Sequence, residues 1–189
     1  MLNNSSNFNK LKSELADIFS KAEFELEGAH SLDTLDWVKK IDPNAGESLQ
    51  IAALAHDIDR GIKPKIKRKE NETYDDYKTR HAKRSSQLIA WLMAKNDYSK
   101  ELIKETGRLV ENHEVGGDKE TDILMDADSI SFFSCNIDWY YNYKSRNLDE
   151  TKKGIKYKYE RATPRAQKLI KSIKIQNRAL KDICEEIFN

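Results

Sequence analysis

The amino-acid sequence predicts an all-α, single-domain helical bundle with a C-terminal helical extension. Three observations predict it. Hydrophobic residues recur three and four positions apart along nearly the whole chain, whereas the alternation typical of strands is not sustained anywhere. The chain has 189 residues, a length for one domain. It contains only 7 Gly and 3 Pro, which leaves little material for a turn-rich β-sandwich or a disordered linker.

The first predicted helix lies within residues 1–21 and packs on the bundle. Its apolar side chains, with Lys and Glu between them, are Phe8, Leu11, Leu15, Ile18 and Phe19. A second helix is predicted over 29–41, and it ends before an Asp-Pro-Asn sequence because a residue that precedes proline avoids the α region. A third is predicted over 45–59, with His56 on its inward face and Gly61 as its stop.

The middle of the chain is predicted to be a basic loop followed by three helices. Residues 60–69 carry six Lys and Arg side chains and no acidic one. The first of the three helices covers 74–95 and places His81 on a face with Leu side chains. The second covers about 102–113 and is closed by a Gly-Gly pair, and the third covers about 121–130.

The C-terminal part is predicted to extend the same domain with further helices. An aromatic stretch over 139–143 continues in helical register. Thr163 followed by proline marks the start of one last helix, whose apolar side chains run from Leu169 to Ile187. The predicted divisions are 1–21 for the N-terminal helix, 22–135 for the core and 136–189 for the extension.

The charge balance and the cysteine count exclude several classes of protein. With 33 Lys and Arg against 32 Asp and Glu, the net charge is +1, which argues against a generally basic nucleic-acid binder. Two Cys residues cannot form a disulfide framework, which favours a reducing cytosol. The chain opens without a signal-peptide pattern, and no apolar run approaches the roughly 18 to 20 residues that span a bilayer. We therefore expect a cytoplasmic protein with no membrane partner.

The four His residues are spaced as ligands of one buried site would be. His30, His56, His81 and His113 lie 26, 25 and 32 residues apart, roughly one helix and its connection each. One His on an apolar helix face is more often a hydrogen-bonded core residue than a ligand, but four buried titratable rings need compensating partners. Together with the neighbouring Asp57 carboxylate, converging imidazoles suit one or two divalent transition metal ions: Mn, Fe, Co, Ni or Zn.

Five short segments around these residues carry a recognisable pattern. They are Ala29-His30-Ser31-Leu32, Ala52-Ala53-Leu54-Ala55-His56-Asp57-Ile58, Arg80-His81-Ala82, Glu111-Asn112-His113-Glu114 and Leu124-Met125-Asp126-Ala127-Asp128-Ser129-Ile130. In this order they resemble the HD-domain superfamily of metal-dependent phosphohydrolases. The resemblance covers about residues 22–135 and implies an HD-type all-α bundle, which agrees with the periodicity.

The resemblance also implies a set of metal ligands. The primary ligands that it implies are His30, His56, Asp57 and Asp128. Asp128 is favoured over Asp126 because the Asp of the last Ala-Asp pair stands at the family's ligand position. Asp126 is expected to cap a helix or to contact a ligand. His81 and His113 occupy the additional positions that dinuclear members use, so two metal ions are favoured over one.

Phosphoester hydrolysis at such a site needs three kinds of group. Metal ions lower the pKa of a bridging water enough to supply hydroxide, which attacks phosphorus. Cations are then needed for the outer phosphate oxygens, and a proton donor for the leaving group. The candidates for binding phosphate are Arg60, Lys63 and Arg84. The candidate catalytic carboxylates are Asp57, Asp59 and Glu114.

Residues 139–161 form a further segment of interest, because they hold five of the eight Tyr side chains and a local excess of cations. Aromatic side chains of this kind can stack on a nucleobase. An amphipathic helix that packs on the bundle, or the surface of a homodimer, is the favoured interpretation.

The predicted function is metal-dependent hydrolysis of a phosphoester of a small molecule, with a nucleotide as the favoured substrate. The same six ligand types occur in HD-type proteins that resemble di-iron oxygenases, so oxidation of a small polyol or phosphonate is the alternative. A further alternative is a module that senses a nucleotide without turning it over.

Overall fold

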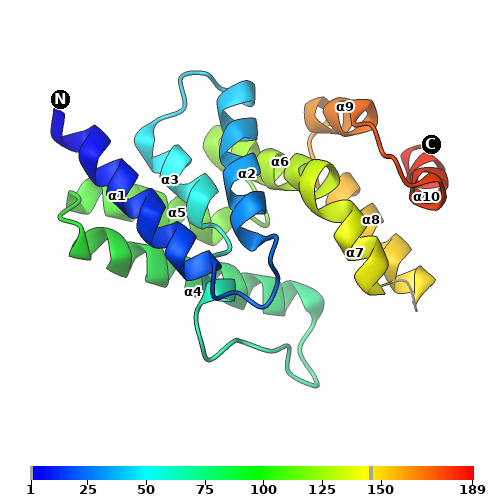
Figure 1. Ribbon diagram of the computed structural model, residues 1–189, viewed down its shortest axis with the longest axis horizontal. Coiled ribbons are helices and arrows are strands. Elements are labelled where there is room, and N and C mark those ends of the chain that lie inside the picture. The colour runs from blue at the N-terminus through cyan, green and yellow to red at the C-terminus, as the bar shows by residue number, and fades with distance from the viewer. Residues whose placement is uncertain (1, 145–146) are drawn as a thin grey trace.

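The computed structural model describes residues 2–144 and 147–189, and every regular element in these ranges is helical (Figure 1). The predicted all-α class is therefore confirmed. Residue 1 of the predicted first helix, and residues 145 and 146 of the segment 139–161, lie outside the described residues.

Three kinds of helix make up the described part of the fold. The α-helices are α1 (Leu2–Phe19), α2 (Glu27–Ile41), α3 (Glu47–Ala55), α4 (Tyr74–Lys95), α5 (Lys100–Asn112), α6 (Lys119–Ser131), α7 (Ile137–Lys144), α8 (Leu148–Glu160), α9 (Pro164–Ser172) and α10 (Arg178–Phe188). A short 3-10 helix, η1 (Ile58–Gly61), follows α3, and a π-helical segment, η2 (Phe132–Asn136), joins α6 to α7. The helix α8 lies within the segment 139–161, for which an amphipathic helix that packs on the bundle is the favoured interpretation.

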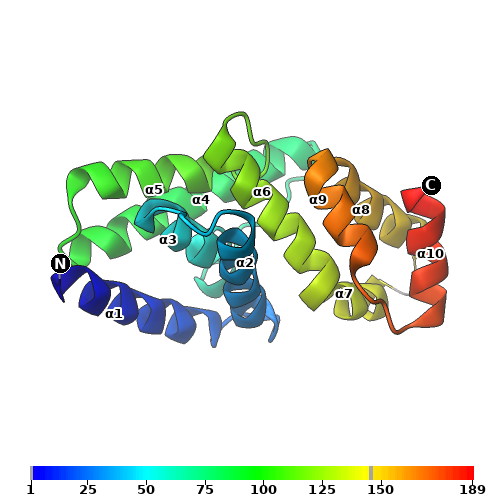
Figure 2. The ribbon, with the colours of Figure 1, turned by 90° about the horizontal axis from the view of Figure 1, so that it is seen from above.

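The α-helices form two groups that meet along α6. In the first group α2 packs against α3 and α6, α3 against α5, and α4 along α5, while α1 lies across η1 and α3. In the second group α8 packs against α7, α9 and α10, and α9 also contacts α6. Figure 2 shows this second group at the opposite end of the molecule from α1.

Several helices begin at side chains that the sequence supplies as caps. The Thr163 side chain accepts a hydrogen bond from Ala166 N, and Pro164 is the first residue of α9, as the Thr-Pro signal predicts. Thr73 and Ser99 cap α4 and α5 in the same way. These caps explain why the helices start where they do.

The helix predicted over 45–59 is shorter than expected, because α3 ends at Ala55 and η1 follows. Asp57, between them, has φ −107° and ψ 20°. Residues two apart on an α-helix point in different directions, yet Asp57 and Asp59 both contact the ring of His81. The break in the helix turns both carboxylates toward the same imidazole.

The single last helix predicted after Thr163 is two helices. α9 ends at Ser172, and Ile173 has an extended backbone with φ −70° and ψ 130°. Asn177 then caps α10 by accepting a hydrogen bond from Leu180 N. Hydrophobic periodicity could not separate the two, because both helices bury apolar side chains and both contact α8.

The N-terminal helix packs on the bundle as the sequence predicts, with Leu11, Leu15 and Phe19 buried. It also presses on η1. A Cβ atom added at Gly61 would lie 2.6 Å from the carbonyl oxygen of Ile18. Glycine is therefore required where α1 crosses the turn that follows Asp57.

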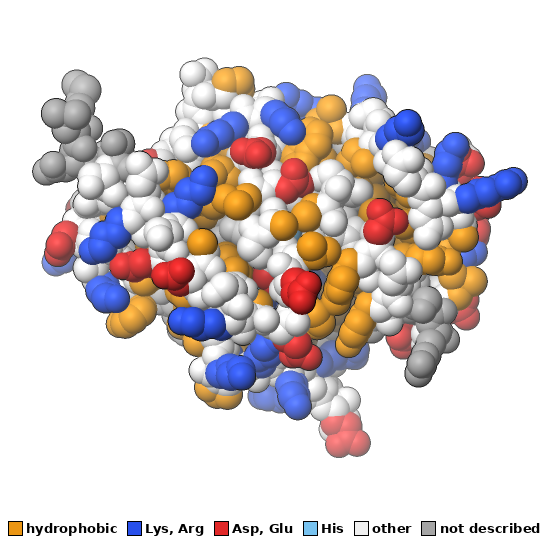
Figure 3. All heavy atoms as spheres, viewed as in Figure 1, with side chains coloured by type: hydrophobic (Ala, Val, Ile, Leu, Met, Phe, Trp, Pro, Cys, Tyr) orange, Lys and Arg blue, Asp and Glu red, His pale blue; other side chains and the backbone are white. Residues whose placement is uncertain are grey.

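The surface carries charges of both signs. Figure 3 shows Lys and Arg side chains interspersed with Asp and Glu on the face viewed there. Among the described residues, no helix combines the length and the apolar character needed to cross a membrane.

Candidate metal centre

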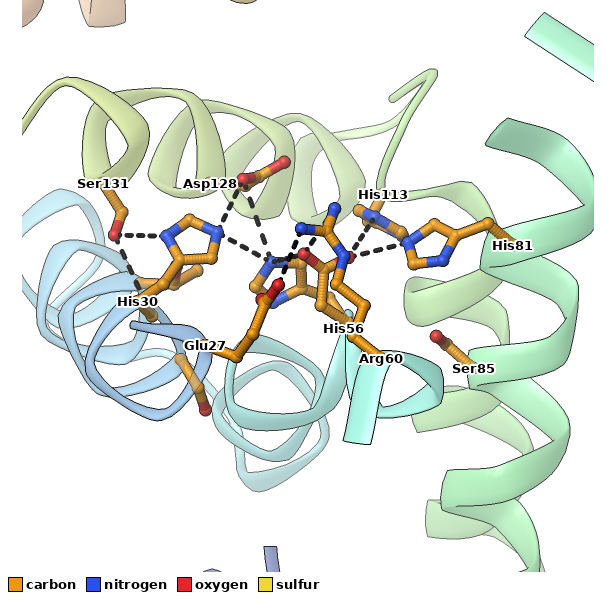
Figure 4. A network of polar contacts seen from close by, with 12 residues as sticks. Glu27, His30, His56, Arg60, His81, Ser85, His113, Asp128 and Ser131 are labelled. Carbon is orange, nitrogen blue, oxygen red and sulfur yellow. Dashed lines mark hydrogen bonds and ion pairs between the residues drawn. The ribbon is translucent and has the colours of Figure 1, made fainter. Parts of the chain in front are cut away.

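Six buried side chains from five parts of the chain meet inside the bundle, and Figure 4 labels all of them except Asp57. They are His30 of α2, His56 and Asp57 after α3, His81 of α4, His113 at the end of α5 and Asp128 of α6, each at most 4% exposed. All six were predicted ligands. They form two groups, His30–His56–Asp128 and Asp57–His81–His113, and the ligand atoms of each group lie within 4.8 Å of one another. Either group could hold a metal ion.

The imidazoles are oriented through Nδ1, which leaves Nε2 facing the other ligands. His56 and His113 each donate from Nδ1 to the carbonyl oxygen three residues earlier, at 3.0 and 2.7 Å. His30 Nδ1 lies 2.9 Å from Ser131 Oγ. Metal-binding histidines use such partners to fix the tautomer and the ring orientation. The arrangement is therefore the one a metal ligand set requires.

Asp57 lies between the two groups. Its Oδ1 atom is 2.7 Å from His81 Nε2 and 3.9 Å from His113 Nε2, and its Oδ2 atom is 3.7 Å from His56 Nε2. Arg60 Nη2 also lies 2.9 Å from Oδ2. Burial alone would raise the pKa of Asp57, but Arg60, His56 and His81 hold it well below its usual value. The carboxylate is thus ionised and within reach of both groups.

His56 and His81, one from each group, differ in protonation. Burial lowers the pKa of His56 to about 3, against the attraction of Asp57 and Asp128, so its imidazole is neutral. Burial acts in the same direction on His81, but Asp57 and Asp59 outweigh it and raise the pKa of His81 to about 9. Because a ligating histidine must be neutral, a metal ion that binds His81 must displace a proton.

The donor set fits a transition metal ion. His113 Nε2 is buried and has no hydrogen-bond partner among the described residues, and Glu114 Oε1 lies 3.3 Å from it. His30 Nε2 faces His56 Nε2 at 3.3 Å. A third group, His113–Glu114–Asp128, overlaps both of the others. Buried nitrogens that lack a donor or acceptor are costly, and imidazoles with carboxylates are ligands that such ions prefer.

Asp59 and Glu114, the other candidate catalytic carboxylates, both contact predicted ligands. Asp59 Oδ1 lies 2.8 Å from His81 Nδ1, so it orients that ring from behind. Glu114 pairs with Lys78 and Arg161. Burial would raise the pKa of Glu114, but these two cations hold it well below its usual value. An ionised Glu114 cannot act as a proton donor in this state.

Asp126 and Asp128 face different parts of the molecule. The Asp126 carboxylate accepts hydrogen bonds from Thr163 N and Oγ1 at 2.8 and 2.6 Å, so it holds the start of α9. Asp128 Oδ1 lies 3.1 Å from His30 Nε2. Asp128 belongs to the ligand group with His30 and His56, whereas Asp126 belongs to neither of the two groups described above.

Two cations that no motif marked enter the centre from the C-terminal extension. Lys158 Nζ lies 3.0 Å from Asp128 Oδ2, and Arg161 pairs with both Asp128 and Glu114. Burial, with Arg161 beside it, lowers the pKa of Lys158 to about 8. The available signals were the excess of cations in 139–161 and the spacing of three, which puts both side chains on one helix face.

A pocket of about 600 Å³ opens beside the ligands, and His30, Asp57 and His81 form part of its wall. Its aromatic lining consists of Phe24, Tyr74, Tyr77, Phe132, Trp139, Tyr140 and Tyr143. Its basic lining consists of Arg60, Lys65, Lys67, Arg68, Lys78 and Lys158. Apolar walls with a few charged groups are typical of small-molecule sites. This lining suits a ligand that carries both a ring and an anionic group.

The three predicted phosphate-binding residues are separated by the fold. Arg60 lines the pocket. Lys63 is exposed on the loop 60–69 and is not part of the lining. Arg84 donates to the carbonyl oxygen of Ile62 at 3.4 Å, so it braces the loop from behind. Besides Arg60, the cations that line the pocket come from other positions of the loop and from α4 and α8.

Comparison with known proteins places the chain in a family. The family described as a domain of unknown function, DUF4202, matches residues 6–183. Neither the search of curated proteins nor the search of solved structures found a match. The matched region includes both the ligands of the core and the cations of the C-terminal extension.

Proposed function

The chain belongs to the DUF4202 family, a domain of unknown function, and we propose that it is an HD-type metal-dependent phosphohydrolase. Its proposed substrate is a phosphoester of a small molecule, with a nucleotide as the favoured class. The observation that carries the proposal is the position of the two ligand groups, which lie against one pocket with cationic and aromatic walls.

Bound ions and protein side chains would have different roles at the metal centre. Divalent ions held by the two groups would supply Lewis acidity and, from a coordinated water, a hydroxide nucleophile near neutral pH. Asp57 offers an ionised carboxylate to both groups. Asp59 holds His81 so that Nε2 faces the other ligands. These contacts fix the ligands before any ion arrives, which reduces the cost of assembling the site.

The cations of the pocket are suited to binding phosphate. Arg60 is held by Asp57 at 2.9 Å and by Glu27 at 3.2 Å, while 37% of its side chain stays exposed. A guanidinium group offers five N–H donors in a planar fork that matches phosphate oxygens. Lys78 lines the same pocket. Cations here would stabilise the charge that develops on phosphoryl oxygens during transfer.

The aromatic wall favours a nucleotide among small phosphoesters. The rings of Trp139 and Tyr143 are stacked, with centroids 5.1 Å apart and planes 13° apart. Phe24 packs edge-on against both, at 4.7 and 5.8 Å. Bases of every kind have flat faces that stack on such rings. A pocket of about 600 Å³ is within the usual range for a ligand of this size.

Metal analysis combined with an activity screen tests the proposal. Protein purified without chelator should contain two transition metal ions per chain and should hydrolyse nucleotides or other phosphoesters with added Mn, Co or Ni. His56→Ala and Asp57→Ala should lose both properties, whereas Asp126→Ala should keep the metal. Hydrolysis that is unchanged in His56→Ala or Asp57→Ala would contradict the proposal.

The same experiment separates the two alternative functions. Two iron ions per chain, with O₂ consumption and an oxidised polyol or phosphonate product, would replace the proposal by a di-iron oxygenase. Tight nucleotide binding without product, with each metal tried, would replace it by a nucleotide-sensing module.

A further inference from the structure

We infer that Glu27 is a specificity-determining residue that accepts a hydrogen bond from a sugar hydroxyl group of the nucleotide substrate. This inference rests on the proposed function. It places the sugar between a phosphate at the metal ligands and a base at the aromatic wall. The preferred substrate is then a nucleotide whose sugar keeps that hydroxyl.

Glu27 has an unpaired carboxylate oxygen inside the pocket. The residue is 4% exposed and forms part of the pocket lining. Arg60 Nη1 donates to Oε1 at 3.2 Å, whereas Oε2 is buried and has no hydrogen-bond partner among the described residues. A buried acceptor without a donor carries a desolvation cost. A ligand that supplies a donor at this point removes that cost.

The carboxylate is held in place before a ligand binds. Glu27 is the first residue of α2, where the free backbone N–H groups of a helix favour a negative charge. Arg60 bridges Glu27 and Asp57, which ties the carboxylate to the metal centre. An acceptor that is already held in place loses little conformational entropy when a ligand binds, so it discriminates well between ligands with and without a donor.

The order of residues from the turn before α2 into its first turn places Glu27 between the two ends of the pocket. Phe24, Glu27 and His30 are spaced by three and all line it, and Glu27 N donates to Phe24 O at 3.2 Å. Phe24 packs against Trp139 at the aromatic wall, whereas His30 belongs to a ligand group. In a nucleotide the sugar lies between the phosphate and the base. Its hydroxyls are therefore the donors nearest to Glu27.

The chemistry at Glu27 favours a neutral donor over a cation. The free oxygen of this carboxylate is a hydrogen-bond acceptor, so its partner must be a donor. Arg60 already supplies a positive charge to Glu27. Glu27 is also absent from the groups of side chains that could hold a metal ion. A hydroxyl group meets these conditions.

The test measures binding without turnover. Non-hydrolysable 5′-methylenephosphonate analogues of ribonucleosides are compared with their 2′-deoxy and 3′-deoxy counterparts by titration calorimetry on the protein as purified. The wild type should bind the ribose form at least about tenfold more tightly than one of the deoxy forms, the effect of a hydrogen bond to a charged group. Glu27→Leu, which removes the acceptor, should bind all forms equally.

Two further variants complete the design. Glu27→Gln keeps an acceptor without the charge, so its discrimination should lie between those of the wild type and Glu27→Leu. If circular dichroism shows that Glu27→Leu is unfolded, the discrimination measured with Glu27→Gln tests the inference in its place. Lys104→Ala changes an exposed residue of α5 outside the pocket and should keep the wild-type ratio.

Four results would overturn the inference. These are equal binding of ribose and deoxy forms by the wild type, discrimination that persists in the Glu27 variants, loss of metal from those variants, and no binding of any analogue. Hydrolysis of phosphoesters without discrimination would leave the proposed function in place and remove the role of Glu27. Discrimination without hydrolysis would support the role of Glu27 and contradict the phosphohydrolase.

Discussion

The core helices and the C-terminal extension bring opposite chemistry to one site. The elements from α2 to α6 supply imidazoles and carboxylates, whereas α8 and the turn after it supply Lys158 and Arg161. The carboxylates of Asp128 and Glu114 are neutralised across this boundary. The core therefore provides the ligands together with the cations Arg60 and Lys78, and the extension adds the cations that pair with Asp128.

The largest expected effect follows from removing the carboxylate shared by the two ligand groups. Asp57→Ala should lose bound metal and lower kcat/KM by roughly a thousandfold or more, because metal ions contribute several kcal/mol of charge stabilisation. Elemental analysis and steady-state kinetics measure both. Full metal content in this variant would show that the core ligands do not act as one centre.

Removing the main cation of the extension should destabilise the protein without removing a ligand. Arg161→Met leaves Asp128 and Glu114 with fewer partners, and breaking a buried ion pair costs about 3 kcal/mol or more. Urea unfolding in the presence of a chelator measures the loss. With metal present the loss should be smaller, because bound ions also neutralise these carboxylates. An equal loss in both conditions would contradict the division between ligand and counter-charge.

Removing the carboxylate behind His81 should weaken metal binding while leaving the ligands in place. Asp59→Ala frees the Nδ1 side of His81, which lies 2.8 Å from Asp59 Oδ1. Loss of such a partner lowers metal affinity by about 10- to 100-fold. Competition with a metal-sensitive dye measures the affinity. An unchanged affinity would show that the core orients His81 by other contacts.

The smallest effect is expected from removing the Asp126 carboxylate, which holds the start of α9. Asp126→Ala removes both hydrogen bonds to Thr163 at the start of α9. Loss of such a cap costs about 1 kcal/mol. Thermal unfolding should report this loss with unchanged metal content. A fall in metal content would mean that Asp126 supports the ligands as well as α9.

The two regions also differ in how far the sequence predicts them. The chain has only four His residues. Their order along the sequence, together with Asp57 and Asp128, therefore left few alternative sets of ligands. Lys158 and Arg161 are two of 33 cations, so residue type alone could not mark them. Their role comes from the way α8 packs, which depends on tertiary contacts.

Local breaks escaped prediction for a related reason. The end of α3 before Asp57 leaves the apolar pattern intact, since Ile58 is still buried in η1. The direction of Lys63 depends on how the loop is anchored, for example by the ion pair of Lys65 with Glu23 at 2.9 Å. Hydrophobic spacing carries no information about either feature.

The separation of Asp128 from its cations along the chain has a consequence for biosynthesis. Lys158 and Arg161 follow Asp128 by 30 and 33 residues. At typical translation rates the ribosome needs roughly two to seven seconds to make that stretch. During this interval all six ligands exist, whereas the two cations that pair with Asp128 do not. If the two ligand groups bind divalent ions as proposed, a nascent core that lacks Lys158 and Arg161 would attract those ions more strongly than the finished chain. The order of synthesis would then favour metal loading before the extension packs on the site.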